Sequence, residues 1–472
     1  MRMKKLLALL LALALVFSLA ACGGADKDTA ESGNGDNAAT TDGTGDAAGA
    51  DDDASTDGAA ASDETLNEQY TYDESIYAPY REMVEGKDPS QIKLGFIMIG
   101  DESEGYTEAH VTGIKTMCEQ LGVDYDSQIV IKWNVGEDES CYEAAVELVE
   151  AGCTAVVGNS FGFEDYLIQA ASEFPDVQFL HATGYQAAQS GLPNMHNFFV
   201  DVFQSRYVSG VVAGTKLLQM IDAGEVDASK EIPIGYVGAY SYAEVVSGYT
   251  AFYLGLKSVV GDYPVQMYVT YTGSWGSESL EYDAAISLID EQNCVMICQH
   301  ADTTGAPSAC EERGVYCVGY NISMIEAAPT RALVSATLNW GAYYTYAAAT
   351  LISGGTIDTD WAAGYPEGAV YITPINRDAF GSDAEYNAAV ESSNLAIAGL
   401  LDGSIQVFDT SKFTVNGETV TTTASDDLAD TYYGVEHIQT ENGITFYAES
   451  AIGSAPSFAF RIDGITELNV VY

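Results

Sequence analysis

The sequence predicts an α/β protein with two doubly wound parallel-sheet lobes, joined by crossing hinge strands and followed by a C-terminal β-rich extension. Two observations support this prediction. From about residue 91, short β-rich apolar runs alternate with amphipathic helical runs, a pattern typical of parallel strands that helices cover on both faces. The series also holds more strand candidates than one sheet of ordinary size contains.

Chain length and composition agree with this fold class. The chain has 472 residues, enough for two or three ordinary domains, and 47% of them are apolar. We therefore expect a large packed core. The chain carries 69 Asp and Glu residues against 18 Lys and Arg residues, which gives a formal net charge of -51. Such a charge repels phosphate backbones, so nucleic acid is excluded as a partner.

The N-terminus has the layout of an export signal. A basic start, Arg2 to Lys5, precedes an apolar run, Leu6 to Ala21. The run ends in Leu-Ala-Ala-Cys-Gly, which resembles the lipobox of bacterial lipoproteins; there the signal peptide, here 1–21, is removed and the cysteine, here Cys22, is acylated. An ordinary signal peptidase site beside an incidental cysteine is the alternative. No later stretch reaches the about 18 to 20 apolar residues that a membrane span needs.

A polar stretch, residues 22–69, separates the signal from the folded part of the chain. Between Gly23 and Thr65 it contains no Val, Ile, Leu, Met or aromatic residue. It cannot bury enough apolar surface to fold, so we expect a disordered acidic tether with a root-mean-square span of about 35 to 40 Å. Two roles stay open for it: a spacer through a cell-wall layer, or a solvated acidic tail.

The order of strand and helix candidates defines the two lobes. The first lobe takes residues 70–201 and is completed by about 332–368. The second lobe takes residues 202–331 and is completed by about 369–408. The clearest helical patterns are 106–121 and 278–292. Strands are expected at 93–99, 128–133, 154–157, 177–182, 197–201, 233–237, 265–271, 294–299, 315–319 and 332–338.

The β-rich extension comprises residues 409–472. Residues 413–420 read as a hairpin with an Asn-Gly turn, and 444–448 and 458–462 look like further strands. We favour an elaboration of one lobe over a separate binding domain.

Seven cysteines follow Cys22. An odd number cannot all pair within the chain, and each of the seven lies within or beside an apolar run. We therefore expect buried thiols rather than a disulfide framework or a zinc site, although the disulfide state stays open. These cysteines are Cys118, Cys141, Cys153, Cys294, Cys298, Cys310 and Cys317.

Residues just after the strand candidates combine aromatic rings, glycine and a few hydrogen-bonding groups. Ligands of open parallel sheets bind beyond the carboxyl ends of the strands, so these residues form the candidate site. This chemistry suits a flat, neutral ligand held between rings and read at its polar edges. The candidate ligand-binding residues are Tyr106, Phe161 and Trp275 as ring platforms, His300, Asp302 and Asn321 as hydrogen-bonding groups, and Trp340. For Asp302, capping a helix that begins near Gly305 is the alternative role.

Several motifs follow one another between about Lys93 and Ser404. They are Asp101 to Thr107, Gly158-Asn159-Ser160-Phe161, Phe174 to Phe179, Gln299 to Thr303, Gly314 to Asn321, and Asn339 to Tyr344. Through these motifs the chain resembles the basic membrane protein family, also called the PnrA-like family, of solute receptors for ATP-driven importers. The last three motifs are similar to a branch of that family in which purines are the expected ligands.

The resemblance implies a fold like that of type I periplasmic binding proteins and a receptor rather than an enzyme. It implies a monomeric, lipid-anchored solute-binding protein of an ABC importer, on the outer face of the cell membrane. The receptor would bind a purine base or nucleoside between its lobes and deliver it to a permease, without cofactor or metal. Thr183, Ser323 and Gly276 stand where many members carry carboxylates, which shifts the expectation toward a free base or a differently decorated ligand.

Two other classes of function are alternatives to this receptor. Gly158-Asn159-Ser160-Phe161-Gly162 matches the nucleophile elbow of α/β-hydrolases, with Ser160 as nucleophile and His300 or His437 downstream. Too few strands precede this motif, however, and no oxyanion segment is found, so we expect no enzyme. A surface sensor or adhesion lipoprotein, suggested by the extension, is the third class. Which purine is bound, whether ribose is present and which permease is served stay open.

Overall fold

The computed structural model describes residues 68–423, 436–451 and 453–472. The expected signal peptide and Cys22 lie outside these ranges, as does almost all of the expected tether. Within the described ranges, no helix combines the length and the apolar character that crossing a membrane requires.

The first lobe is built on a six-stranded sheet with the order β11-β5-β4-β3-β1-β2, in which every pair is parallel. In the register of this sheet, Leu94 lies beside both Ile129 and Ala155. The central strands are buried along their length, because helices cover both faces of the sheet. The strands are β1 (Leu94–Ile97), β2 (Ile129–Lys132), β3 (Ala155–Gly158), β4 (Gln178–Ala182), β5 (Met195–Val200) and β11 (Asp360–Ala363).

The helices of the first lobe include the expected helix 106–121, found as α3. Glu104 caps this helix by accepting hydrogen bonds from two backbone N–H groups, and Gly122 ends it in the left-handed conformation. The helical segments are η2 (Glu74–Tyr77), α2 (Ala78–Met83), η3 (Pro89–Gln91), α3 (Gly105–Leu121), α4 (Tyr125–Gln128), α5 (Glu139–Glu150), η4 (Phe161–Phe163), α6 (Glu164–Glu173), α7 (Ala187–Ser190) and α12 (Trp340–Ser353).

The second lobe is built on a seven-stranded sheet with the order β12-β10-β9-β8-β6-β7-β15. All pairs are parallel except β12, which runs antiparallel to β10. The strands are β6 (Ile232–Gly238), β7 (Val265–Tyr271), β8 (Met296–Gln299), β9 (Tyr316–Tyr320), β10 (Ala332–Leu338), β12 (Val370–Ile372) and β15 (Ile465–Glu467). The helical segments are α8 (Val202–Ala223), α9 (Ala243–Val260), α10 (Glu278–Asp290), α11 (Gly305–Arg313), η5 (Arg377–Ala379) and α13 (Asp383–Leu401).

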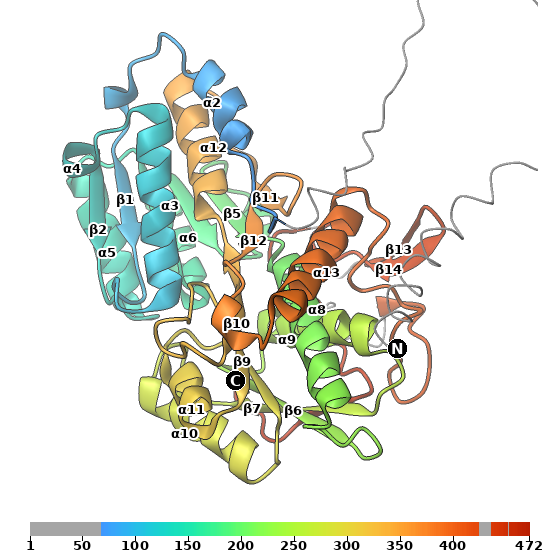
Figure 1. Ribbon diagram of the computed structural model, residues 1–472. Helices are drawn as coiled ribbons and strands as arrows, with labels where there is room; N and C mark the ends of the chain where they lie inside the picture. The colour runs from blue at the N-terminus through green and yellow to red at the C-terminus, as the bar shows by residue number, and fades with distance from the viewer. Residues whose placement is uncertain (1–67, 424–435, 452) are drawn as a thin grey trace, which may run out of the picture. The chain divides into compact units, whose positions relative to one another are not determined.

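The chain crosses between the lobes after β5, after β10 and after β11. The prediction that residues 332–338 complete the first lobe is wrong. These residues form β10, which is buried throughout and pairs with β9 of the second sheet. The crossing falls at Asn339 instead, and the following helix α12 packs on α3 of the first lobe (Figure 1). Strand β11 then joins β5, and β12 returns to the second sheet.

Close contact between α8 and α9 organises the second lobe beside the crossings (Figure 1). A Cβ on Gly210 would lie 2.1 Å from the carbonyl oxygen of Phe252, and a Cβ on Gly255 would lie 2.0 Å from that of Tyr207. The two backbones therefore touch where glycine leaves room. Helix α13 packs against α8 as well.

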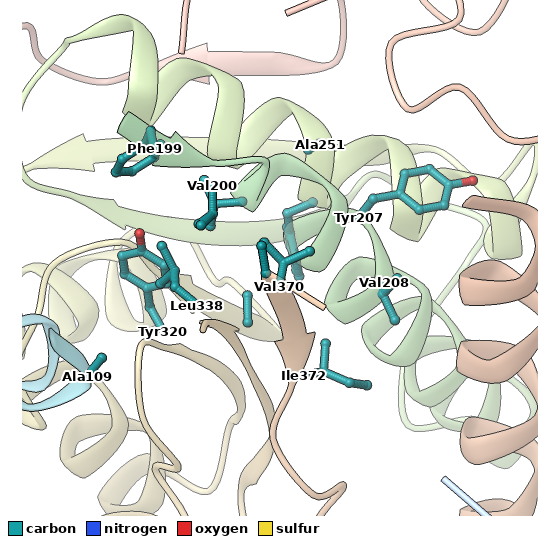
Figure 2. Close-up of a cluster of buried hydrophobic side chains, with 14 of the residues drawn as sticks. Ala109, Phe199, Val200, Tyr207, Val208, Ala251, Tyr320, Leu338, Val370 and Ile372 are labelled. Carbon is teal, nitrogen blue, oxygen red and sulfur yellow. The ribbon is translucent and has the colours of Figure 1, made fainter. Parts of the chain in front are cut away.

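A continuous buried cluster lies where β5 enters α8, beside the ends of β9 and β10 and the antiparallel strand β12 (Figure 2). Its members come from segments far apart in the sequence, so the crossings are fixed by apolar burial. Labelled members include Phe199, Val200, Tyr207, Val208, Tyr320, Leu338, Val370 and Ile372. The seven cysteines of the described residues are all buried and free, which confirms the expected buried thiols.

The C-terminal extension joins the second lobe. Asn416 and Gly417 have positive φ angles of 53° and 80°, and Val415 and Glu418 exchange backbone hydrogen bonds, so the expected hairpin turn forms. Strands β13 (Ile438–Glu441) and β14 (Ile444–Tyr447) form a second hairpin. The expected strand 458–462 is wrong, because this buried segment joins no ladder. The strand that pairs is β15, which adds to the edge of β7.

Substitution Gly255→Ala tests the contact between α8 and α9. In an exposed helix this change stabilises by about 1 kcal/mol, because alanine has the higher helix propensity. Here the added Cβ meets the carbonyl of Tyr207, so we expect destabilisation by about 1 to 3 kcal/mol. Thermal and urea unfolding measure the change. Ala398→Ser, at an exposed position of α13, is the control. A Gly255→Ala protein at least as stable as the wild type would contradict the contact.

Candidate functional site

One cavity collects residues from the carboxyl ends of both sheets. Its lining includes residues that follow β1, β3, β4, β7 and β8, residues near the carboxyl ends of β5 and β9 themselves, and residues at the start of α3 and α9. The C-terminal extension adds two further residues. The lining residues are Ile99, Tyr106, Asn159, Ser160, Phe161, Thr183, Phe199, Tyr242, Glu244, Trp275, His300, Asp302, Tyr320, Ala455 and Pro456.

Aromatic rings from both lobes line this cavity. The three expected ring platforms, Tyr106, Phe161 and Trp275, all lie there. Phe161 of the first lobe packs against Tyr242 of the second, with ring centroids 5.3 Å apart, and Tyr242 also contacts Trp275 at 6.1 Å. Tyr106 is fixed by its hydroxyl, which donates a hydrogen bond to the carbonyl of Asn159 at 2.7 Å. The rings therefore hold defined positions around the cavity.

Trp340 lies outside the cavity lining. Its side chain is fully buried and stacks on His110, with centroids 4.1 Å apart and an angle of 13° between the planes. It also meets Tyr106 edge to face, at 5.9 Å. Because α12 begins immediately after Asn339, this tryptophan packs under the site rather than in it. Trp340 thus supports Tyr106 from behind.

His300 lines the cavity as expected, with both ring nitrogens engaged. Nε2 lies 2.6 Å from an oxygen of Glu244, and Nδ1 lies 3.0 Å from the hydroxyl of Tyr236. Burial lowers the pKa of His300, and the Glu244 carboxylate raises it less. A neutral ring that donates from Nε2 and accepts at Nδ1 satisfies both contacts.

Two side chains of the cavity have a buried polar atom without a hydrogen-bond partner. In Asn159 the amide oxygen accepts from the backbone N–H of Ile99 at 2.9 Å, and Nδ2 is unpartnered. In Glu244 one oxygen contacts His300, and the other, Oε1, is unpartnered. Asn159 belongs to the first lobe and Glu244 to the second. The cavity therefore offers one free donor and one free acceptor, one from each lobe, and buried polar groups of this kind require a partner.

Asp302 lies at the cavity within a group of acidic side chains. Asn321 Nδ2 donates to one of its oxygens at 2.6 Å. Burial raises the pKa of Asp302 well above its usual range, and the carboxyls of Glu104, Glu281 and Glu244 raise it further. Burial also raises the pKa of Glu104, and it raises that of Glu281 to about 7. Neighbouring carboxyls of this kind do not all ionise together, so the group retains protons near neutral pH.

The alternative role of Asp302 as a helix cap is wrong. The hydroxyl of Thr303, not the carboxylate of Asp302, accepts the hydrogen bond of Gly305 N–H, at 3.2 Å. The backbone of Asp302 instead connects segments of the site. Its N–H donates to the carbonyl of Trp275 at 3.0 Å, and its carbonyl accepts from Gly105 of the first lobe at 3.1 Å. The last of these hydrogen bonds joins the two lobes.

Asn321 does not line the cavity. Its backbone has a positive φ of 63°, and its carbonyl accepts a hydrogen bond from Thr337 Oγ1. This conformation aims its side chain at Asp302. Asn321 is therefore a positioning residue for Asp302 rather than a ligand-facing group.

The elbow-like segment around Ser160 has no catalytic arrangement. The Ser160 hydroxyl donates to Glu137 at 2.6 Å, and the backbone N–H of Gly162 donates to the same oxygen at 2.8 Å. His181 Nε2 contacts the carbonyl of Ser160, not its hydroxyl. Of the two histidines considered for a triad, His300 is engaged with Glu244 and Tyr236, and His437 stacks on Tyr447.

Arg206 is a buried charge that sequence reasoning missed. Its guanidinium lies 3.6 Å above the ring of Tyr320, a cavity residue, and Nη1 donates to the carbonyl of Gln299 at 2.7 Å. The side chain is fully buried. The available signal was that Arg206 is the one basic residue in the first three turns of α8, among apolar residues such as Val202 and Val208.

A family model for PnrA-like ABC transporter substrate-binding proteins matches residues 98–398, a range that includes every cavity residue except Ala455 and Pro456. The chain belongs to this family. This confirms the family membership that the sequence motifs predict.

A purine-binding protein of Brucella abortus (strain 2308) is 33% identical over 288 residues, which are 61% of this chain and 76% of the relative. A protein of Haloferax volcanii, provisionally named as an ABC transporter glucose-binding protein, is 26% identical over 270 residues, 56% of this chain and 62% of the relative. Among solved structures, an ABC transporter solute-binding protein of Conexibacter woesei DSM 14684 matches with a TM-score of 0.52 and 19% identity. That match covers 67% of this chain and 98% of the other, and it confirms the two-lobed α/β fold.

The positions at which this PnrA-like protein departs from the family pattern differ in their relation to the cavity. Thr183 lines it and has a positive φ of 67°, which is costly for a β-branched residue and common at binding sites. Gly276 lies beside Glu104, where an added Cβ would come within 3.4 Å of that side chain. Ser323 is not part of the lining. The Thr183 hydroxyl donates a hydrogen bond to the carbonyl of Ala182 at this edge of the cavity.

The raised pKa of Glu281 predicts a pH dependence of stability. The pKa of Glu281 is raised to about 7 in the folded protein, so the folded state binds this proton more tightly than the unfolded state. The contribution is complete below the ordinary pKa of glutamate and is lost as the pH rises through about 7. We expect Glu281→Gln to remove about 2 to 3 kcal/mol of the fall in unfolding free energy between pH 5 and pH 8.

Urea unfolding at several pH values measures this effect. Glu278→Gln, at an exposed position in the first turn of the same helix, serves as the matched control and should leave the pH profile unchanged. Equal profiles for the wild type and Glu281→Gln would show that Glu281 is ionised in the folded protein.

Proposed function

We propose that this ABC transporter substrate-binding protein is a lipid-anchored extracellular receptor that binds a purine base or nucleoside and delivers it to a membrane permease. The observation that carries the ligand class is the pair of unpartnered polar atoms at the cavity, Asn159 Nδ2 and Glu244 Oε1. A purine has ring nitrogens that accept hydrogen bonds and N–H groups that donate them. One donor and one acceptor on opposite lobes match such an edge pattern.

The ring walls support the same ligand class. A purine is flat and aromatic, so it gains from stacking against rings such as Phe161, Tyr242 and Trp275. The acidic group around Asp302 and Glu244 favours N–H donors and disfavours anionic ligands, a nucleotide phosphate among them. The similarity to a purine-binding protein of Brucella abortus points in the same direction.

A sugar is the competing ligand, because rings and carboxylates also bind sugar hydroxyls. The provisional name of the Haloferax volcanii relative is the observation that favours it. A sugar, however, would need hydrogen-bond partners for hydroxyls around its whole edge. The side chains of the cavity hold only a few free polar atoms, so we favour the purine.

Ligand binding would favour the closed arrangement of the lobes. The ligand would contact Asn159 on one lobe and Glu244 on the other, so its binding energy depends on both being close. The backbone hydrogen bond from Gly105 to Asp302 also joins the lobes in this arrangement. Release to a permease would require that hydrogen bond to break as the lobes separate.

Substitution Glu244→Gln tests the ligand assignment. It removes the charge and one acceptor at nearly constant volume, so we expect purine affinity to fall at least about ten-fold, equivalent to about 1.4 kcal/mol. Calorimetric titration with adenine, hypoxanthine and guanine measures the affinity, and Glu278→Gln is the matched control, since that residue is exposed on α10. Mass spectrometry of ligand released from the purified protein gives an independent answer. Glucose binding without purine binding would refute the purine proposal and leave the family membership intact.

The anchor is tested at Cys22, which lies outside the described residues. Acylation requires the thiol, so Cys22→Ser should give an unprocessed precursor or a released protein that radioactive palmitate does not label. The unaltered chain, expressed in the same host, is the positive control. Palmitate labelling of the variant would show that Cys22 is not the lipidated residue.

A further inference from the structure

One wall of the cavity is formed by residues outside the range that the family model matches. Ala455 and Pro456 line it, although the family match ends at residue 398. They belong to a segment that we call the C-terminal strap, residues 449–451 and 453–461. The rest of the lining comes from residues 99–320, so the strap is added to a site that the two lobes already form.

The strap is fixed to the second lobe by a buried carboxyl group. Glu449 accepts hydrogen bonds from Ser247 of α9 at 2.7 Å and from the backbone N–H groups of Ser457 and Phe458 at 3.1 and 2.8 Å. Phe458 stacks on Phe408 with ring centroids 4.2 Å apart. These contacts bracket Ala455 and Pro456 on both sides, so the two residues have little freedom to withdraw from the cavity.

The strap also reaches the first lobe. The backbone N–H of Ser454 donates to a carboxylate oxygen of Asp360 on β11 at 2.6 Å. Ala459 packs with Ala243 at the start of α9, where Phe161 and Tyr185 of the first lobe pack against both. The strap therefore contacts both lobes while it closes one side of the ligand cavity.

The chemistry of this wall restricts what can lie against it. The side chains of Ala455 and Pro456 carry no donor or acceptor, and the proline ring fixes its own backbone angle. A ligand substituent with several hydroxyls, such as a ribosyl group, would lose water there without gaining side-chain partners. An unsubstituted edge of a planar ring incurs no such cost.

We propose that the C-terminal strap is a specificity-determining wall of the ligand site, which admits an unsubstituted purine and rejects one that carries a ribosyl group. This inference rests on the proposed purine ligand. It assigns to residues 455 and 456 a role in ligand selection, and it makes Asp360 a positioning residue that holds the strap in place through Ser454.

Binding measurements on strap variants test the proposal. The probes are adenine and hypoxanthine against adenosine and inosine, titrated calorimetrically. The wild type should bind each base at least ten-fold more tightly than its nucleoside. Ala455→Leu should weaken base binding at least ten-fold, because the longer side chain enters the cavity. Ala451→Leu, the same change at an exposed position of the strap, is the matched control and should bind as the wild type does.

Asp360→Ala gives a second, independent measurement. Without the carboxylate the strap loses its hydrogen bond to the first lobe, so the preference for base over nucleoside should fall at least five-fold. Equal affinity of the wild type for bases and nucleosides would overturn the inference, as would an Ala455→Leu protein with unchanged base affinity.

Failure of the proposed function gives a different pattern of results. A wild type that binds no purine refutes the purine ligand. The strap is then tested with the compound that mass spectrometry recovers from the purified wild type. Ala455→Leu should lower the recovered amount of that compound relative to Ala451→Leu, and equal recovery would overturn the role of the strap.

Discussion

The direction of the strands is the constraint on which the site depends. In both large sheets every pair of neighbouring strands is parallel except β10 with β12. Parallel strands end together at one edge, so the residues that follow them gather there whatever their distance in the sequence. The crossings after β5 and β10 bring the two edges to one cavity, and the buried cluster of Figure 2 fixes those crossings.

Electrostatics then determines what such a cavity can hold. The second lobe places Asp302, Glu281 and Glu244 close together, and Glu104 approaches from the first. The buried guanidinium of Arg206 lies behind Tyr320, out of hydrogen-bonding reach of these carboxyls in the contacts that the structure shows. Burial therefore favours the protonated forms of Asp302, Glu104 and Glu281. We expect such a cavity to accept a neutral ligand with N–H donors more readily than an anion.

The fold class, strands β1 to β10 and five of the seven expected site residues could be predicted from sequence, since strand tips in parallel sheets are recognisable from apolar runs. Tyr106, Phe161, Trp275, His300 and Asp302 all line the cavity. Trp340 could not be placed correctly, because the start of a helix directly after a strand turns its ring into the core. Asn321 was identified by its position after β9, but its backbone conformation directs it to Asp302.

Other contributions could not be read from the sequence, because they arise from tertiary packing. Glu244 lies on α9, beyond the tip residues that follow β6, and only helix orientation brings its oxygen to the cavity. Asn159 belongs to a motif that the sequence analysis identified. Its Nδ2 faces the cavity lining without a partner because the Ile99 N–H donates to its Oδ1, and this contact cannot be predicted from sequence. Ala455 and Pro456 are distant in sequence from every other lining residue.

The late position of the strap in the chain has a consequence for biogenesis. A polypeptide emerges from its N-terminus, so both lobes can begin to fold before residues 449–461 and the edge strand β15 are available. The lobes would first meet as an open-sided intermediate that lacks a cavity wall and leaves the edge of β7 unpaired. Addition of the strap and of β15 therefore completes the binding cavity and covers the exposed edge of β7 at the same stage of folding. A chain that lacked both segments would have neither the complete cavity nor the covered sheet edge.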